Sequence, residues 1–103
     1  GLLAIKVKAA CKGINKLAVI SSDFDSINED IYTSLKERLS SEGIELVEIK
    51  EALSDGKDLE KMISIGNCIA LEKAGSTKIK NFAMLKELCT ECDIKLHGVV
   101  NVN

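Results

Sequence analysis

Residues 16–43 read KLAVISSDFDSINEDIYTSLKERLSSEG and contain an apolar run, a polar turn and an amphipathic segment. The unbroken apolar run Leu17–Ile20 is typical of a strand buried on both faces of a sheet. The segment after the turn predicts a helix that ends at Gly43, because apolar residues recur along one face. That face comprises Ile27, Ile31, Leu35 and Leu39. A buried strand followed by a helix is the opening unit of a parallel α/β sheet.

The turn between this strand and this helix lies where such sheets bind ligands, at the carboxyl end of a strand. It contains no glycine to bring backbone amides near a phosphate and no lysine to neutralise one, and Asp23 and Asp25 would repel it. Ser26 and Glu29 have the S-x-x-E spacing of a capping box. The acidic cluster of Asp23, Asp25, Glu29 and Asp30 could hold magnesium, but the helix dipole explains it without a ligand.

The rest of the chain continues the alternation of strands and helices. Strands are predicted at 44–49, 68–71 and 94–102, and helices at 58–65 and 78–92, with Asp58 as the cap of the shorter helix. The partial alternation of 44–49 places that strand nearer an edge. Residues 2–12 are predicted as a helix that stops at Gly13, with a strand as the alternative. The pattern predicts one α/β domain over residues 1–103, with three layers and about four mainly parallel strands in a Rossmann-like or P-loop-NTPase-like arrangement.

Composition narrows the function classes. The chain has 103 residues, 46% of them hydrophobic, which suffices for a single core. Lysine and arginine total 14 against 16 acids, with no basic segment, so nucleic-acid binding is not expected. Its apolar runs are short and interrupted by charge, which argues against membrane insertion of this segment. Four cysteines without the spacing of a disulfide scaffold fit a reducing, cytoplasmic compartment.

Three motifs could carry chemistry, and a structural role is favoured for each. Cys89 and Cys92 form a C-x-x-C at a predicted helix C-terminus, where the dipole opposes thiolate formation, so core packing is favoured over redox or zinc chemistry. Their helix is predicted to carry one apolar face, made of Ile79, Phe82, Leu85, Cys89 and Cys92. His97, the only histidine, lies in a predicted strand and is interpreted as structural. Tyr32 lies one position off its helix stripe and is expected to be half-buried.

Gly75-Ser76-Thr77 combines a glycine and two hydroxyls with the predicted start of a helix. Such a place can hold an anion, although Ser76 or Thr77 acting as a plain N-cap is the more frequent case. The motif alone does not establish an anion site.

The second half of the chain reads NCIALEKAGST at 67–77, then a predicted helix, then IKLHGVVN at 94–101. These residues resemble the C-terminal part of the P-loop ATPases of the bacterial tyrosine-kinase and MinD/ParA group. There a strand ends in a short G-T turn, a helix follows, and the next strand carries G-V-V-x-N. Lys16–Ser22 is likewise similar to the family's k-x-I-x-V-T-S strand. Within the group, the chain resembles the cytoplasmic kinase-like domain of capsule and exopolysaccharide chain-length determinants.

The departures from this family concern its catalytic groups. Where the family has a glycine-rich loop with lysine and serine or threonine, this chain has Asp23-Phe24-Asp25-Ser26, so Walker A is absent. Where the family has an aspartate-rich signature, this chain has Glu48-Ile49-Lys50-Glu51, and it lacks a tyrosine-rich tail. Phosphoryl transfer is almost entirely phosphate positioning and charge neutralisation. We therefore expect no kinase or ATPase activity, no catalytic residue, no cofactor and no metal site.

The resemblance implies a non-catalytic pseudo-ATPase or kinase-like domain that acts in bacterial capsule, exopolysaccharide or lipopolysaccharide biosynthesis. It also implies a cytoplasmic location, tethered to the inner face of the membrane by a segment outside residues 1–103. Gly1 in place of an initiating methionine favours such a piece of a longer protein. The alternatives are a nucleotide-binding enzyme with an atypical phosphate site at Gly75–Thr77, and a flavodoxin-like module for a small ligand.

The expected contact surface is the carboxyl rim, defined here as the loops 22–26, 51–58, 74–77 and 101–103. Because strands of a parallel sheet end at one edge, these loops should converge. The expected partner is a protein domain or a second copy of this chain. The candidate residues are Ser22, Asp23, Phe24, Asp25, Ser26, Gly75, Ser76, Thr77 and Asn101.

Overall fold

The computed structural model describes residue 7 and residues 13–102, so the predicted helix at 2–12 lies almost entirely outside the described residues. Strands and helices alternate along the chain, as predicted. The strands are β1 (Lys16–Ile20), β2 (Glu45–Glu48), β3 (Asn67–Lys73) and β4 (Lys95–Val102), and the helices are α2 (Glu29–Ser41), α3 (Gly56–Ile65) and α4 (Ile79–Glu91). A single 3-10 turn, η1 (Phe24–Ser26), lies between β1 and α2.

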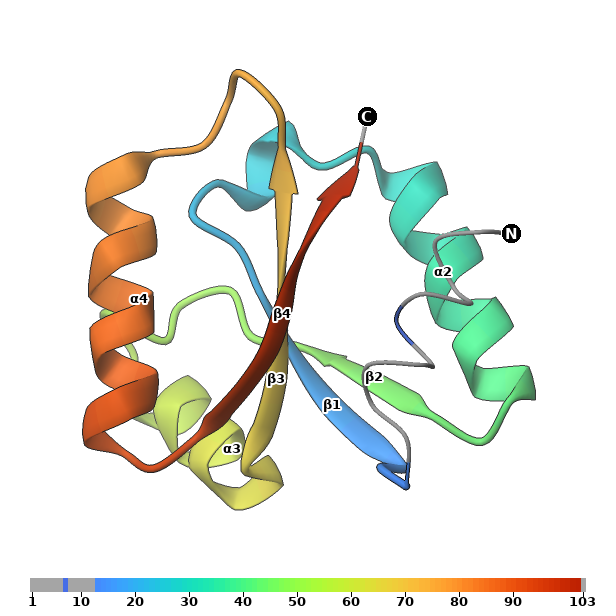
Figure 1. The fold of residues 1–103 in the computed structure, drawn as a ribbon, viewed down its shortest axis with the longest axis horizontal. Coiled ribbons are helices and arrows are strands. Elements are labelled where there is room, and N and C mark those ends of the chain that lie inside the picture. The colour runs from blue at the N-terminus through green and yellow to red at the C-terminus, as the bar shows by residue number, and fades with distance from the viewer. Residues whose placement is uncertain (1–6, 8–12, 103) are drawn as a thin grey trace.

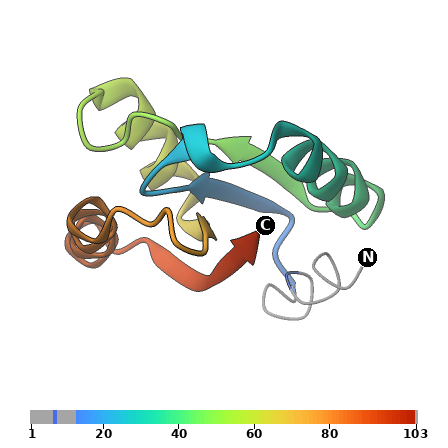
Figure 2. The ribbon, with the colours of Figure 1, turned by 90° about the horizontal axis from the view of Figure 1, so that it is seen from above.

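The four strands form one all-parallel sheet in the order β2-β1-β3-β4. The α/β class and the four-stranded parallel sheet are confirmed, and β2 is an edge strand as its partial alternation predicted. Helix α2 covers one face of the sheet, and α3 and α4 cover the other (Figures 1 and 2). This is a three-layer, Rossmann-like arrangement, and it brings the ends of β1 and β3 side by side at the centre of one edge.

The side chains of β1 alternate between two apolar cores, which is why this strand reads as a continuous hydrophobic run. Leu17 and Val19 enter the core under α2, whereas Ala18 and Ile20 enter the core under α3 and α4. All four are at most 1% exposed, so the strand is buried on both faces as predicted. Val7, the one described residue of the N-terminal segment, is buried in the α2 core.

The structure corrects two predicted helix caps. Helix α2 is capped by Asn28, whose side-chain oxygen accepts hydrogen bonds from the backbone N–H groups of Asp30 and Ile31. The predicted capping box of Ser26 and Glu29 is therefore wrong, because Ser26 is held in the preceding 3-10 turn. Helix α3 begins at Gly56, two residues earlier than predicted, with Asp55 as its cap. The carboxylate of Asp58 instead accepts a hydrogen bond from the N–H of Glu51.

Two burial predictions also change. Ile79 is 80% exposed, so the predicted apolar face of α4 does not begin there, and Leu85 and Cys89 are its buried members. Tyr32 was expected to be half-buried but is only 8% exposed, because it joins Leu35 and Leu39 in the α2 core. Among residues 7 and 13–102, no helix has the length and apolar character needed to cross a membrane.

Candidate functional site

The centre of the carboxyl rim is the turn that follows β1. Ser21 and Ser22 follow Ile20, the last residue of β1, and η1 then leads the chain toward α2. The backbone N–H of Asp23 donates to Ser21 Oγ at 3.1 Å, and Ser26 Oγ donates to the Asp23 carbonyl at 2.8 Å. The turn is thus closed by its own polar groups.

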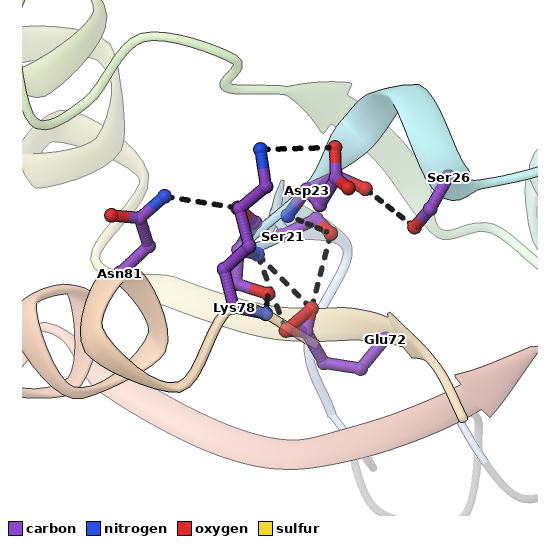
Figure 3. Close-up of polar contacts among 7 residues, drawn as sticks. Ser21, Asp23, Ser26, Glu72, Lys78 and Asn81 are labelled. Carbon is purple, nitrogen blue, oxygen red and sulfur yellow. Dashed lines mark hydrogen bonds and ion pairs between the residues drawn. The ribbon is translucent and has the colours of Figure 1, made fainter. Parts of the chain in front are cut away.

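Glu72, near the end of β3, binds this turn from the neighbouring strand. Its carboxylate accepts the backbone N–H of Ser22, with Oε2 at 3.0 Å and Oε1 at 3.3 Å. Oε2 also accepts a hydrogen bond from Ser21 Oγ at 3.1 Å (Figure 3). Glu72 is only 3% exposed, so a buried carboxylate holds the backbone amide that follows the first strand.

Helix α4 reaches the same turn through its first residues. The N–H of Lys78, the N-cap of α4, donates to Ser22 Oγ at 2.9 Å, and Asn81 Nδ2 donates to the Ser22 carbonyl at 3.3 Å. Ser22 therefore takes the role that a capping side chain would have at this helix. The prediction that Ser76 or Thr77 caps the helix is wrong, because the cap residue is Lys78 and the hydroxyl comes from a distant turn.

A solvent-exposed ion pair completes the cluster. Lys78 Nζ lies 3.8 Å from Asp23 Oδ1, above the Ser21 and Glu72 contacts (Figure 3). The Lys78 side chain is 58% exposed, so this pair contributes at most a fraction of a kcal/mol, in the range of about 0–1. The buried contacts of Glu72 and Ser22, and not this ion pair, hold the turn in place.

Beside the turn lies an open groove of about 820 Å³. Its walls are the turn itself, the first turns of α2, the end of β2 and the start of α4. The lining charges are mixed: Asp23, Asp25, Glu29, Glu48 and Glu51 against Lys36, Lys50 and Lys78. Such a lining favours neither a polyanion nor a single cation. Its volume falls in the range of about 300–1,000 Å³ that is typical of small-molecule sites.

Tyr32 lines the groove from α2, and its hydroxyl oxygen is the polar atom of interest there. Within the described part of the chain, its hydroxyl is buried and makes no hydrogen bond. Burial, with a smaller effect of the Glu48 carboxylate, raises the pKa of Tyr32 to about 12. The phenol therefore stays protonated at neutral pH and can donate a hydrogen bond.

The rim residues predicted from the sequence are only partly brought together. Ser22, Asp23, Phe24 and Asp25 line the groove, whereas Ser26, the last residue of the 3-10 turn, does not. Gly75, Ser76 and Thr77 lie in the loop after β3 and do not line it. Asn101 lies beside Glu72 in the register of β3 and β4, and it is exposed. The loop after β2 does converge on the rim, because Lys50 and Glu51 line the groove.

Two residues essential to the rim, Glu72 and Lys78, were missed by sequence reasoning. Glu72 follows the apolar run Cys68–Leu71, and a charged residue inside a strand that is otherwise buried was the available signal. Its partners lie 50 and 51 positions away, so only the pairing of β1 with β3 could reveal them.

The arrangement has no free anion cradle after β1, since the Ser22 amide is taken by Glu72 and the Asp23 amide by Ser21. Across residues 7 and 13–102, no group of three or more His, Cys, Asp or Glu side chains is placed to hold a metal ion. His97 bonds Asn67 Oδ1 through Nε2 at 2.9 Å, between the starts of β4 and β3, which agrees with its structural interpretation. Cys89 packs in the core at the end of α4, as predicted, and Cys92 packs against that core.

No protein-family model, curated protein or solved structure matches the chain with significance. The resemblance to P-loop ATPases therefore remains a prediction from the sequence, and the site is interpreted from its own geometry.

Proposed function

We propose that this chain is a non-catalytic, pseudo-ATPase or kinase-like domain that acts through protein contacts at its carboxyl rim. The observation that carries the proposal is the carboxylate of Glu72 on the backbone amide of Ser22. In a nucleotide-binding relative, amides at this place would face a phosphate. Here a buried negative charge already accepts the hydrogen bond, and Asp23 and Asp25 add like charge to the turn.

The atypical phosphate site considered at Gly75–Thr77 is disfavoured by two contacts. The N–H of Lys78 is engaged by Ser22 Oγ, and the N–H of Ser76 donates to the carbonyl of Lys73. Amides that already have partners must lose them before they can bind phosphate, which costs free energy. This supports a domain that does not bind nucleotide.

The proposed process, assembly of a bacterial surface polysaccharide, rests on the sequence resemblance alone. The proposed partner is a second copy of the chain or another protein domain. The shape and the charge of the rim support a protein contact. The rim contains a broad groove that is lined by both acidic side chains and lysines. Interfaces of this mixed polarity are common for non-obligate partners.

The first test is a titration of the full chain with ATP, ADP and GTP, with and without magnesium, followed by thermal unfolding. A ligand present at 100 times its dissociation constant would stabilise the folded state by about 2.7 kcal/mol. We expect no shift for any of the three nucleotides. An active P-loop ATPase, measured in parallel, supplies the positive control, and a clear shift for this chain would overturn the proposal.

The second test measures self-association by size-exclusion chromatography with light scattering over a range of concentrations. The matched variants are Asp25→Lys, at the rim, and Glu91→Lys, at the far end of α4, because both reverse one exposed acid. We expect dimer formation that weakens in Asp25→Lys and is unchanged in Glu91→Lys. A wild-type chain that stays monomeric at every concentration would exclude the second copy as the partner.

A second candidate function, a small-ligand module, is favoured by the groove and by the unpartnered hydroxyl of Tyr32. A fragment screen by ligand-observed NMR tests it. Fragments that bind the wild type and lose affinity in Tyr32→Phe would support this function over a purely protein-binding rim.

A further inference from the structure

Three cysteines gather where the start of β3 meets the end of α4, at the opposite end of the sheet from the carboxyl rim. Cys68 Sγ lies 3.6 Å from Cys89 Sγ, and either thiol can donate to the other. Cys92, the C-cap of α4, follows three residues later and packs against the same apolar cluster. Residues three apart on a helix lie on the same side, so Cys92 and Cys89 are neighbours.

The three thiols differ in access to solvent. Cys68 is 0% and Cys89 3% exposed, whereas Cys92 is partly exposed at the end of the helix. The cluster thus leads from the surface at Cys92, through Cys89, to Cys68 in the interior. Of the three residues, Cys92 is therefore the one that lies nearest to solvent.

The contact between Cys68 and Cys89 favours Cys89 as the thiol that attacks an oxidised Cys92. The hydrogen bond with Cys68 lowers the pKa of Cys89 below its ordinary value, against the opposing effect of burial. Because the thiolate is the nucleophile in thiol–disulfide exchange, this contact makes Cys89 more reactive than burial alone would allow. The C-x-x-C motif read from the sequence therefore has a third thiol that the spacing did not reveal.

We propose that Cys92, Cys89 and Cys68 form a redox relay in which hydrogen peroxide enters at Cys92 and the product is a disulfide between Cys68 and Cys89. This inference is independent of the function proposed for the rim. It assigns to this end of α4 a site of reversible oxidation.

The relay has three balanced steps. The Cys92 thiolate attacks one peroxide oxygen, the O–O bond breaks, and hydroxide leaves as water after taking up a proton, so that Cys92 becomes a sulfenic acid. The Cys89 thiolate then attacks the Cys92 sulfur, forming a Cys89–Cys92 disulfide and releasing a second water. The Cys68 thiolate finally attacks the Cys89 sulfur, and Cys92 leaves as a thiolate. One peroxide and two thiols thus give one disulfide and two waters.

The positions of the three thiols explain why the disulfide moves from Cys89–Cys92 to Cys68–Cys89. Cys92 is the best solvated of the three, so it is the most favourable leaving group, and the Sγ atoms of Cys68 and Cys89 are already in contact. The final disulfide joins β3 to α4 across a separation of 21 residues. A crosslink of this span restricts the unfolded chain and should raise the melting temperature by about 15 °C.

The test treats the reduced full chain with graded hydrogen peroxide, blocks remaining thiols by alkylation under denaturing conditions, and maps disulfides by mass spectrometry without reduction. We expect the Cys68–Cys89 disulfide as the end product, together with the rise in melting temperature and its reversal by dithiothreitol. Cys11→Ser serves as the background, because it removes the fourth cysteine of the chain and leaves only the three thiols of the cluster, and it should leave this product unchanged. Cys92→Ser should slow formation of the product several-fold.

Two outcomes would overturn the proposal. One is an end product in which Cys89 is bonded to Cys92 while Cys68 is still alkylated. The other is a Cys92→Ser variant that forms the Cys68–Cys89 disulfide at the wild-type rate. Mapping the wild-type chain needs no substitution in the core, so the first outcome is decided even where a cysteine variant folds poorly.

Discussion

The turn after β1 and the loop after β3 end neighbouring strands at the same rim, yet they are held in different ways. The β1 turn is bound by β3 through Glu72 and by α4 through Lys78 and Asn81. Among the described residues, the β3 loop is held by a local backbone bond, from the N–H of Ser76 to the carbonyl of Lys73, with Gly75 in the left-handed conformation that this turn requires. The β1 turn is thus held by contacts from distant parts of the chain, and the β3 loop by a local one.

This difference shows how a buried turn and an exposed loop satisfy their backbone groups. A buried backbone amide needs a partner, and at the β1 turn a side chain from the neighbouring strand supplies it. The β3 loop needs no such partner, because its groups are exposed to water. The four predictions below test this contrast, from the largest expected effect to the smallest.

Replacing Glu72 with Leu should have the largest effect, because it leaves the buried N–H of Ser22 without an acceptor. We expect the free energy of unfolding to fall by about 2–4 kcal/mol, measured by urea denaturation. Glu72→Gln keeps an acceptor oxygen and should cost only about 1 kcal/mol. Glu91→Gln, at an exposed acid of α4, is the control and should change stability by less than about 0.5 kcal/mol. A Glu72→Leu variant as stable as the wild type would mean that the contacts of Glu72 with the β1 turn do not stabilise the fold.

The hydroxyl of Tyr32 is buried and has no hydrogen-bond partner among the described residues, and this tyrosine predicts a loss of stability at high pH. Its folded pKa of about 12 lies above the ordinary value of 10.0, so the folded state holds the proton more tightly. This contribution is complete below pH 10 and is lost as the pH rises toward 12, by about 2–3 kcal/mol in total.

The comparison with Tyr32→Phe isolates this effect, because lysines titrate in the same range. The difference in unfolding free energy between the two proteins should grow between pH 10 and 12. At neutral pH the variant should be nearly as stable as the wild type, or slightly more stable, since it removes an unpartnered hydroxyl. Absorbance titration of this single tyrosine measures the pKa directly, and an ordinary value would contradict the prediction.

Ser22→Ala and Ser76→Ala compare the two loops with the same change. Ser22→Ala removes the oxygen that accepts the N–H of Lys78 and should cost about 0.5–2 kcal/mol, as a lost helix cap does. Ser76→Ala should cost almost nothing, because its side chain makes no hydrogen bond within the described part of the chain. Chemical denaturation measures both. Equal effects would show that α4 is capped by its own loop after all.

Asn28→Ala and Ser26→Ala test the correction at the start of α2 and should show the smallest difference. Asn28 accepts two backbone N–H groups, so its loss should cost about 1 kcal/mol. Ser26 bonds only the Asp23 carbonyl in a partly exposed turn, and its loss should cost a few tenths. Thermal unfolding measures both losses. A larger loss for Ser26→Ala than for Asn28→Ala would support the capping box of Ser26 and Glu29 after all.

Much of the fold could be read from the chain because local signals and burial agree there. The apolar run Leu17–Ile20 marked a strand buried on both faces, and Leu35 and Leu39 marked the buried side of α2. The caps were less certain, since several Ser, Asp and Asn residues compete near each helix start. Asn28 and Asp55 prevailed over Ser26 and Asp58, each of which is engaged in another contact.

The sequence by itself determined the α/β class, the parallel sheet, the first strand as one buried on both faces, and the absence of a glycine-rich loop after that strand. These follow from residue periodicity and from residue types within short segments. Only the tertiary structure decided that Glu72 fills the place beside that strand, that Ser22 caps a helix 56 residues away, and that Cys68 contacts Cys89. Each of these contacts joins residues at least 21 positions apart, so they exist only once β1, β3 and α4 have packed together.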